Sequence, residues 1–474
     1  MELFFLAVLV LIMIVALASG YPVAFALPGS AIISIGLAAF FGYLFEGDAD
    51  AYFAVDGPIE WLVAGITNFR SNYWDVETDT LIAIPLFIFM GIMLQKSKIA
   101  EDLLITMGQL FGPIPGGLGI SVIFVGALLA ATTGIVGATV IAMGLISLPT
   151  MLNNNYDRKL ASGIVCSSGT LGQIIPPSIV LVLLGDVLSS SFQQAQLQRG
   201  IYSPETVSVG DLFVGAIIPG LILVLLYMFY LVFISFLKPE SMPPAEVIND
   251  DEKKSLASLL WVLIPPLFLM VAVLGSIIFG IATITEAAGV GAVGALLLAA
   301  TKQQLRFDVL KDVCQETAKL TSMVFLILIG ASIFSLVFRG YEGDELVQAY
   351  LSSVPGGVVG IVVVVMLAMF LLGFVLDFIE ITFVVVPIIA PVLLQMGFDP
   401  IWLGIMIAIN LQTSFLTPPF GFALFYLRGV APQSIKTQQI YRGVIPFVIL
   451  QILMLFLLAV FPEIVTWLPS LIYQ

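Results

Sequence analysis

The architecture of this chain can be inferred from two short stretches, Gly169-Thr-Leu-Gly-Gln-Ile-Ile-Pro-Pro-Ser178 and Asn410-Leu-Gln-Thr-Ser-Phe-Leu-Thr-Pro-Pro419. Each interrupts an apolar run with two consecutive prolines. Proline lacks a backbone donor and clashes with the preceding helical turn, so each pair predicts an unwound helix. In an apolar environment the freed backbone groups need partners. A bound cation, an anion at a half-helix N-terminus, or a kink satisfied by Ser and Thr would each supply them.

The two stretches belong to an internal repeat. Pro149, Tyr156, Asp157, Pro176 and Pro177 recur 242 residues later as Pro391, Phe398, Asp399, Pro418 and Pro419. Upstream, Pro115-Gly-Gly117 matches Pro355-Gly-Gly357 at an offset of 240, and Gly20 and Gly29 match Gly280 and Gly289 at 260. Ungapped matches of Pro, Asp and aromatic residues are more than two Leu-, Ile- and Val-rich segments would share by chance. Repeats of this length define a fold.

Composition sets the environment of the chain. Of its 474 residues, 60% are hydrophobic and only 10% charged, against about 45–50% and about 25% in a soluble domain. Lipid must therefore surround most of the chain, and about 20 apolar residues span a bilayer as a helix. Full spans are predicted near 2–20, 23–45, 79–95, 160–185, 212–237, 258–279, 283–300, 321–338, 400–427 and 444–462.

Several classes of protein are disfavoured. The net charge of −14 argues against nucleic acid as a partner. The chain has no histidine, which removes the commonest general base and metal ligand and argues against a membrane enzyme. Cys166 and Cys314 are interpreted as small buried hydrophobes. The first segment has no positive charge before its apolar run, so we expect an uncleaved helix. The stretch 46–78 is predicted to be an amphipathic helix at the membrane surface.

Two further apolar stretches, 117–150 and 357–396, are interrupted midway, the first at Thr132-Thr-Gly134 and the second between Asp377 and Glu380. Each could be two spans or one re-entrant hairpin. About 14 residues before Gly134 and about 13 after it fall short of a span, which favours hairpins.

Loop charges predict the orientation. With either interpretation of 117–150 and 357–396, 14 of the 17 basic residues fall on one face, and only Arg70, Arg199 and Arg339 on the other. The basic face is therefore predicted to be cytoplasmic, with both termini outside. The two halves are then inverted. The first repeat covers 1–238, the cytoplasmic linker 239–257 and the second repeat 258–474, and each repeat holds one hairpin and one broken helix. Inverted repeats with broken helices are typical of secondary transporters, whose solute site lies near the midplane.

The hairpin tips differ in chemistry. Thr132 to Thr139 supplies hydroxyls and flexible backbone, whereas the second tip supplies Asp377 and Glu380. An acid within the membrane is a functional candidate by default. Asp377 could be a cation ligand or the N-cap of the hairpin helix, and Glu380 a second ligand or a residue facing a water cavity. Glu286 also lies among apolar residues, but its spacing from Thr283 favours a capping box.

At these residues the sequence resembles the large, DctM-like membrane subunit of tripartite ATP-independent periplasmic (TRAP) transporters. The matching motifs are Leu81-Ile-Ala-Ile-Pro-Leu-Phe-Ile-Phe-Met-Gly91, Ser168 to Ser178, Thr283-Ile-Thr-Glu-Ala-Ala-Gly-Val-Gly291 and Thr417-Pro-Pro-Phe-Gly421. The resemblance implies an all-α integral membrane protein, with about ten or more transmembrane helices and two re-entrant hairpins in two inverted repeats. It implies an elevator-type carrier driven by sodium, with no other cofactor, for an organic acid such as a dicarboxylate or sialic acid. It also implies a bacterial inner-membrane location and two partners, a small four-helix membrane subunit and a periplasmic substrate-binding protein.

The resemblance also implies site residues. One sodium ion would be bound by Thr133, Gly134, Gly137, Thr139, Gly169, Thr170 and Gly172, and the other by Asp377, Thr382, Asn410, Thr413 and Ser414. Neighbouring polar residues are candidates for the carboxylate substrate: Thr132, Gln173, Glu380, Gln412 and Thr417. The first tip departs from the family pattern, because Ile135 and Val136 occupy positions that are usually serine.

Two other kinds of solute transport protein remain as hypotheses. One is a sodium-coupled carrier of the same superfamily that works without a binding protein, and the other is a channel without sodium coupling. The long outward loop 186–211, rich in Gln and Ser, is predicted to help dock the binding protein.

Overall fold

The computed structural model describes residues 2–53, 57–74, 80–134, 136–244 and 256–472, and within them the fold is entirely helical. The first half contains α1 (Glu2–Ala18), α2 (Val23–Glu46), α3 (Pro58–Trp74), α4 (Thr80–Lys96), α5 (Ile99–Phe111), α6 (Gly117–Thr133), α7 (Val136–Asn153), α8 (Arg158–Thr170), the 3₁₀ turn η1 (Leu171–Gln173), α9 (Ile179–Gln198), α10 (Val209–Leu237) and the 3₁₀ turn η2 (Pro239–Ser241). The second half contains α11 (Leu256–Ile278), α12 (Ile284–Thr301), α13 (Phe307–Gly340), α14 (Gly343–Ser353), α15 (Gly357–Leu372), α16 (Phe378–Glu380), the π-helical turn η4 (Ile381–Val385), α17 (Val386–Gln395), α18 (Pro400–Leu416), α19 (Phe422–Val430), α20 (Thr437–Val460) and α21 (Glu463–Ile472).

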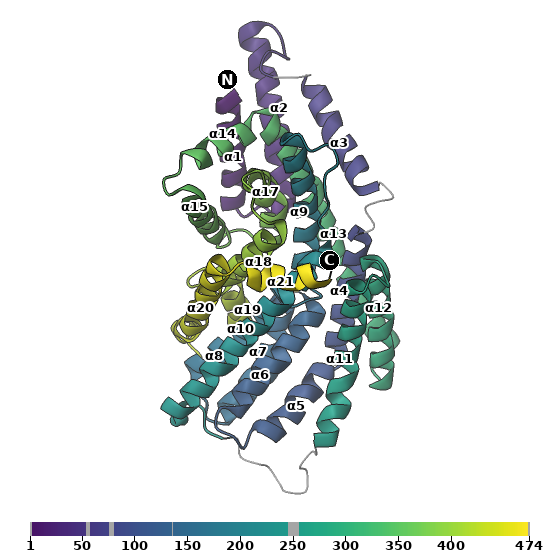
Figure 1. Cartoon of the computed structure of the whole chain (residues 1–474), viewed down its shortest axis with the longest axis vertical. Helices are drawn as coiled ribbons and strands as arrows, with labels where there is room; N and C mark the ends of the chain where they lie inside the picture. The colour runs from purple at the N-terminus through teal and green to yellow at the C-terminus, as the bar shows by residue number, and fades with distance from the viewer. Residues whose placement is uncertain (1, 54–56, 75–79, 135, 245–255, 473–474) are drawn as a thin grey trace.

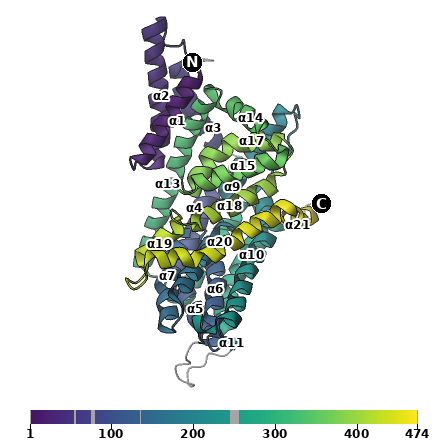
Figure 2. The same ribbon diagram turned by 90° about the vertical axis from the view of Figure 1, so that its left-hand side faces the viewer.

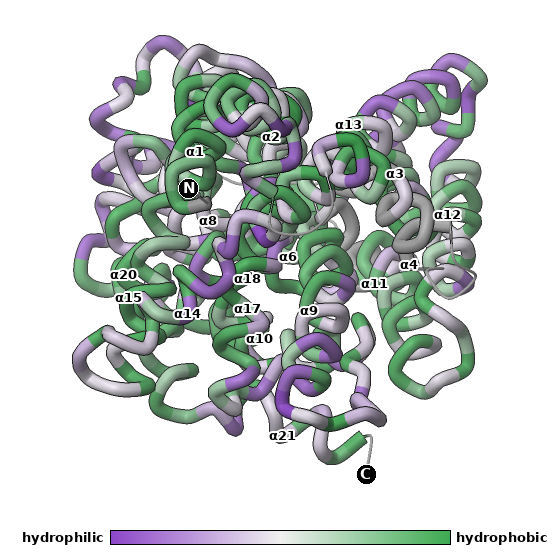
Figure 3. The backbone as a smooth tube through the Cα atoms, turned by 90° about the horizontal axis from the view of Figure 1, so that it is seen from above, coloured by the Kyte–Doolittle hydropathy of each residue, from purple (hydrophilic) through white to green (hydrophobic). Residues whose placement is uncertain are grey.

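The surface of this bundle suits lipid. In the described part, eight helices are long and apolar enough to cross a membrane, and α4 with α5, bent by 56° at the link between them, passes the same test only when the two are taken together. Large apolar side chains point outward, among them Trp261, Phe268 and Val271 on α11. Viewed from above, hydrophobic residues predominate along the chain, and hydrophilic residues form short stretches (Figure 3). The chain is therefore a multi-pass membrane protein, as its composition predicts.

Both Pro-Pro pairs break their helices, and they do so in the same way. Asp157 caps α8 by accepting the backbone N–H groups of Lys159 and Leu160, and Asp399 caps α18 by accepting that of Trp402. The helix then ends at Thr170 in the first case and at Leu416 in the second. Both Pro-Pro bonds are cis. The 242-residue repeat in the sequence is thus a repeat of local structure.

Helices of each half pack against helices of the other half. Helix α2 packs against α13 of the second half, and α12 packs in the equivalent way against α4 of the first. The second arm of each hairpin likewise packs on the other half, α7 on α19 and α17 on α9. Such reciprocal pairs are what an approximate two-fold relation between inverted halves produces. Figure 1 places α6 and α7 in the lower half of the molecule and α15 and α17 in the upper half.

The corners that lead into the hairpins are also alike. Lys98 links α4 to α5 with φ 60°, and Glu342 links α13 to α14 with φ 57°. A left-handed conformation is uncommon for residues other than glycine. Figures 1 and 2 show α5 near one end of the molecule and α14 toward the other. Neither helix was predicted, although α5 is amphipathic and buries Leu103, Leu104 and Met107 on one side.

Several other predictions need correction. The helix predicted within 46–78 exists as α3, but Trp61 is buried against Phe53 and Tyr341 rather than lying at the membrane surface. Cys314 is exposed, because it lies in the polar first turns of α13, and only Cys166 is buried. The short C-terminal helix α21 was missed. Residues 54–56 and 75–79 of the 46–78 stretch lie outside the described residues.

The hairpin arms are longer than the apolar runs suggested. Helix α6 has 17 residues and α7 has 18, because α7 continues through Pro149 to Asn153. Helix α7 is long enough to cross a membrane, so its length no longer favours a hairpin over two spans. The repeat boundaries at 238 and 258 and the outward termini stay predictions. At the linker, Ser241 and Met242 accept the backbone N–H groups of Asp157 and Gly116, while 245–255 lie outside the described residues.

Candidate functional site

The first hairpin tip turns at Gly134. This residue has φ 60°, and its N–H donates to the carbonyl of Ala130 at 3.0 Å. A Cβ atom here would lie 2.9 Å from the backbone nitrogen of Ile179, where α9 begins after the Pro-Pro break. The tip therefore touches the break directly, as predicted for an ion site. The side chains of Thr132 and Thr133 lie outside what the structure describes.

Glycines hold the first hairpin against the broken helix. A Cβ on Gly169 would lie 2.3 Å from Val140 Cγ2, and one on Gly172 would lie 2.9 Å from the carbonyl oxygen of Ala130. Gly137 packs under the ring of Tyr426 on α19, 2.9 Å from where its Cβ would be. Gly134, Gly169 and Gly172 therefore bring the hairpin and the broken helix into backbone contact, whereas Gly137 faces the second half.

Hydroxyl groups satisfy part of this break. Ser178 donates to the carbonyl of Gln173 at 2.9 Å, and Thr170 donates to that of Ser167 at 3.0 Å. These bonds fit the interpretation of a kink satisfied by Ser and Thr. Gln173 is different, because its side chain is fully buried and neither Oε1 nor Nε2 has a hydrogen-bond partner. A buried amide without a partner is rare and points to a missing water or ion.

The second tip is organised by its carboxylates. Asp377 Oδ1 accepts the backbone N–H of Phe378 at 2.7 Å, and Glu380 Oε2 accepts that of Asp377 at 2.9 Å. Together they form a capping box at the start of α16. The N-cap interpretation of Asp377 is thus confirmed, and a role as cation ligand stays a prediction. The predicted capping box of Thr283 and Glu286 is confirmed as well.

Polar residues of α18 face the first arm of this hairpin. Asn410 donates to the carbonyl of Met366 at 2.8 Å, and Ser414, one turn later, donates to that of Phe370 at 2.7 Å. Thr413 and Thr417 instead donate to carbonyls of their own helix. In the π-helical turn behind the tip, Thr382 is fully buried and its hydroxyl has no partner.

The two broken helices share a polar contact between their equivalent positions. Gln412 Nε2 donates to Thr170 Oγ1 at 3.5 Å. These residues are 242 positions apart, which is the offset of the repeat, so each is the equivalent of the other. A contact between equivalent positions lies on the approximate two-fold axis. The Oε1 atom of Gln412 is buried and has no partner.

Tyr426 was missed by the sequence analysis. Its ring covers Gly137 of the first tip. Because Tyr426 lies on α19, it joins the second half of the chain to the first tip. Nothing in the sequence marked Tyr426 as a site residue, because it is an aromatic residue in the apolar segment after Pro419 and such residues are common in membrane-spanning helices.

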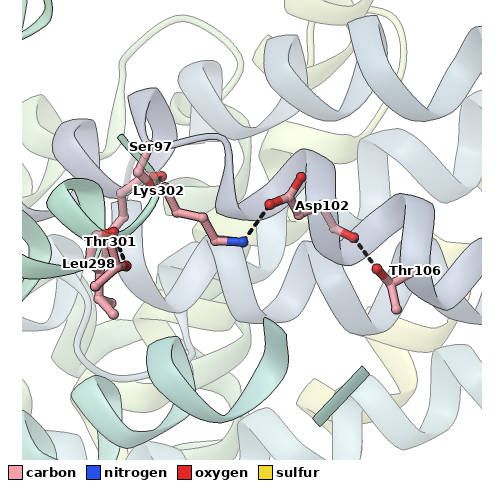
Figure 4. A network of polar contacts seen from close by, with 7 residues as sticks. Ser97, Asp102, Thr106, Leu298, Thr301 and Lys302 are labelled. Atoms are coloured by element: carbon pink, nitrogen blue, oxygen red, sulfur yellow. Dashed lines mark hydrogen bonds and ion pairs between the residues drawn. The ribbon is translucent and has the colours of Figure 1, made fainter. Parts of the chain in front are cut away.

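Charged pairs hold the α4–α5 corner against the second half. Lys302, which follows α12, donates to Asp102 of α5 at 2.6 Å, as Figure 4 shows, and Lys96 of α4 reaches Glu316 of α13 at 3.0 Å. In the same network Thr106 donates to the backbone carbonyl of Asp102. The α4–α5 corner, which precedes the first hairpin, is therefore bonded to the second repeat.

The fold and the paired breaks define a class, the helical membrane transporters with broken helices. The structure resembles the crystal structure of the Alcanivorax borkumensis YdaH transporter with a TM-score of 0.65 and 13% sequence identity, over 93% of this chain and 98% of that one. At that identity the likeness shows a shared fold.

The family follows from the sequence. Residues 10–464 match the model of the DctM component of tripartite ATP-independent periplasmic transporters, and the chain belongs to this family. It is 30% identical to the C4-dicarboxylate TRAP transporter large permease protein of Pseudomonas aeruginosa, over 83% of this chain and 85% of the relative. It is 27% identical to the ectoine TRAP transporter large permease protein of Halomonas elongata, over 98% and 99%. The resemblance seen in the motifs is thereby confirmed.

Proposed function

We propose that this chain is the large permease subunit of a sodium-coupled importer of an organic acid anion in the bacterial inner membrane. The observation that carries the proposal is the set of fully buried, unpartnered polar atoms on Gln173, Gln412 and Thr382, placed where the hairpins meet the broken helices. Leaving such groups unpaired costs about 1–3 kcal/mol each, so a bound ion, water or solute oxygen is the expected partner.

Sodium suits the chemistry of this region. The tips offer backbone carbonyls, hydroxyls and amide oxygens, which are hard ligands of the kind that alkali and alkaline-earth cations take. We assign one ion to the contact of Gly134 and Thr139 with Gly169, Thr170 and Gly172. The second lies between Asp377, Thr382 and the α18 residues Asn410, Thr413 and Ser414. We assign Gln173 and Gln412 to the carboxylate of the solute, to which their side-chain amides would donate.

In the elevator movement that we propose, the hairpins and broken helices move as one body. They are packed to one another through glycines, whereas α4, α12, α2 and α13 pair as a separate reciprocal set. This division favours an elevator movement of the first group against the second. The relatives that carry C4-dicarboxylates and ectoine suggest a small organic acid as solute, and the tripartite family suggests a small membrane subunit and a periplasmic binding protein.

The test is uptake into proteoliposomes that contain this chain and the small membrane subunit, with the binding protein outside. Labelled succinate and ectoine are supplied with an inward sodium gradient or an equal potassium gradient. We expect uptake of one of the two solutes, and only when both the sodium gradient and the binding protein are present. Uptake that is equal in both gradients would remove the coupling. Uptake without the binding protein would instead identify a carrier that works alone.

A further inference from the structure

A small pocket lies apart from the axis, between the first hairpin and the α4–α5 corner. It has a volume of about 60 Å³ and is lined by Gln95, Lys98, Glu101, Leu129, Thr139, Ala142 and Ile146. We call it the corner pocket. One water needs about 10–15 Å³ of such space, so the corner pocket has room for several waters or for a hydrated small ion.

One wall of the corner pocket belongs to the hairpin. Thr139, Ala142 and Ile146 are spaced by three and four residues, so they form one stripe along α7. The stripe begins at Thr139, one turn after α7 starts at Val136, and runs away from the tip. Apart from α6, helix α7 packs mainly on α8 and α19, which belong to the broken helices. This wall would therefore move with the hairpin.

The opposite wall is fixed. Gln95, Lys98 and Glu101 come from the end of α4, the link and the first turn of α5. Asp102, the next residue, is bonded to Lys302 (Figure 4), and Lys96 is bonded to Glu316. Both partners belong to the second half. The corner pocket thus lies at a seam between a group held to the framework and a group held to the ion sites.

The polar groups of the corner pocket are arranged by depth. Lys98 is exposed, Gln95 and Glu101 are half-buried, and Thr139 is only 2% exposed. The ammonium group of Lys98 therefore belongs to the most exposed residue of the lining, and the hydroxyl of Thr139 to its most buried polar residue. A carboxylate raises the local concentration of cations, and oxygen ligands suit sodium better than an anion.

We infer that the corner pocket is the cytoplasmic access route of the coupling cation. Glu101 attracts a hydrated sodium ion, and Thr139 passes it between the pocket and the site at the first tip. The inference rests on the proposed sodium coupling for the identity of the ion and on the orientation predicted from the loop charges for the cytoplasmic side. The pocket as a water-filled, cation-selective route can be tested without transport.

The test uses thiol labelling in the assembled membrane complex with Cys314→Ser as the background, since Cys166 is fully buried. Ala142→Cys and, separately, Ile146→Cys are treated with small cationic or anionic methanethiosulfonate reagents from the cytoplasmic side. Leu145→Cys is the matched control, because it lies on the same helix but its side chain is 58% exposed on the outer surface of the bundle.

We expect both pocket cysteines to react, the cationic reagent roughly three- to tenfold faster than the anionic one, from the field of one nearby carboxylate. Glu101→Gln should abolish this preference and Lys98→Gln should enlarge it, whereas Leu145→Cys should be unreactive. Pocket cysteines as inert as Leu145→Cys, or a preference indifferent to Glu101→Gln, would overturn the route. If labelling behaves as expected but uptake ignores sodium, the sodium coupling fails and the cation-selective route stands.

Discussion

The two hairpin tips occupy equivalent places in the repeat but are built from different chemistry. The first turns on Gly134 and approaches its broken helix through glycines, backbone against backbone. The second is held by Asp377 and Glu380 in a capping box and meets α18 through the side chains of Asn410 and Ser414. The comparison teaches that the approximate two-fold symmetry of the fold determines where each tip lies, whereas the residue types at the two tips can differ.

The largest effect is expected at the first tip. Gly172→Val should disrupt the packing of the break on α6, because even a Cβ would lie 2.9 Å from a backbone oxygen that cannot rotate away. We expect a loss of stability at or above the usual 1–3 kcal/mol of an overpacked site, seen as a lower unfolding temperature in detergent, and no transport.

Gly429→Ala is the matched control, since a Cβ on this α19 residue meets nothing within 4 Å. Alanine should be neutral there or stabilise by up to about 1 kcal/mol. Equal damage from both substitutions would show that backbone contact at the first tip has no special importance.

The second effect concerns the buried hydroxyl behind the second tip. Thr382→Val keeps the shape and removes a group that has no partner in the protein. If the hydroxyl served nothing, the change would be neutral or stabilising. We expect unchanged thermal stability together with a raised sodium concentration for half-maximal uptake. An unaltered sodium dependence would remove Thr382 from the ion site.

A third experiment separates the two roles of Asp377. Asn caps a helix about as well as Asp, whereas Ala costs roughly 1 kcal/mol. Asp377→Asn should therefore retain stability and Asp377→Ala should lose it, when both are measured by thermal unfolding. If the carboxylate is also a cation ligand, both variants lose sodium-dependent uptake. Full uptake by Asp377→Asn would reduce the residue to its capping role, and the tips would then differ less than proposed.

The smallest effect is expected at the α4–α5 corner. The Lys302 and Asp102 side chains are 33% and 41% exposed, and such pairs contribute about 0–1 kcal/mol. A double-mutant cycle of Lys302→Met and Asp102→Asn, read by thermal unfolding, should give a coupling in that range. Arg339 and Asp344 pair at the α13–α14 corner with N–O 3.5 Å and similar exposure, but within the second half, and provide the comparison. A coupling well above this range for Lys302 and Asp102 alone would show that this pair anchors the two halves to each other.

Sequence predicted this fold well where the signal was local. Apolar length located the spans, and Asp157, Asp399 and the Pro-Pro pairs located the breaks, because caps and prolines act on their own helix. It failed where a partner elsewhere in the chain decides. Trp61 is buried against Tyr341, and Tyr426 covers Gly137, and in both pairs the partners lie far apart in the sequence. The ligand sets stay predictions, and nothing local could have shown that the Gln173 side chain is buried without a partner.

The contact between Thr170 and Gln412 makes the middle of this chain resemble the isologous interface of a homodimer, in which a residue on the axis meets its own copy. Here the two copies belong to one gene and have diverged into a hydroxyl and an amide. In a true dimer every substitution on the axis is made twice. In this chain the two positions can mutate one at a time, so the junction can become polar on one side only. A difference between the two proposed ion sites can therefore begin where equivalent positions of the two halves meet.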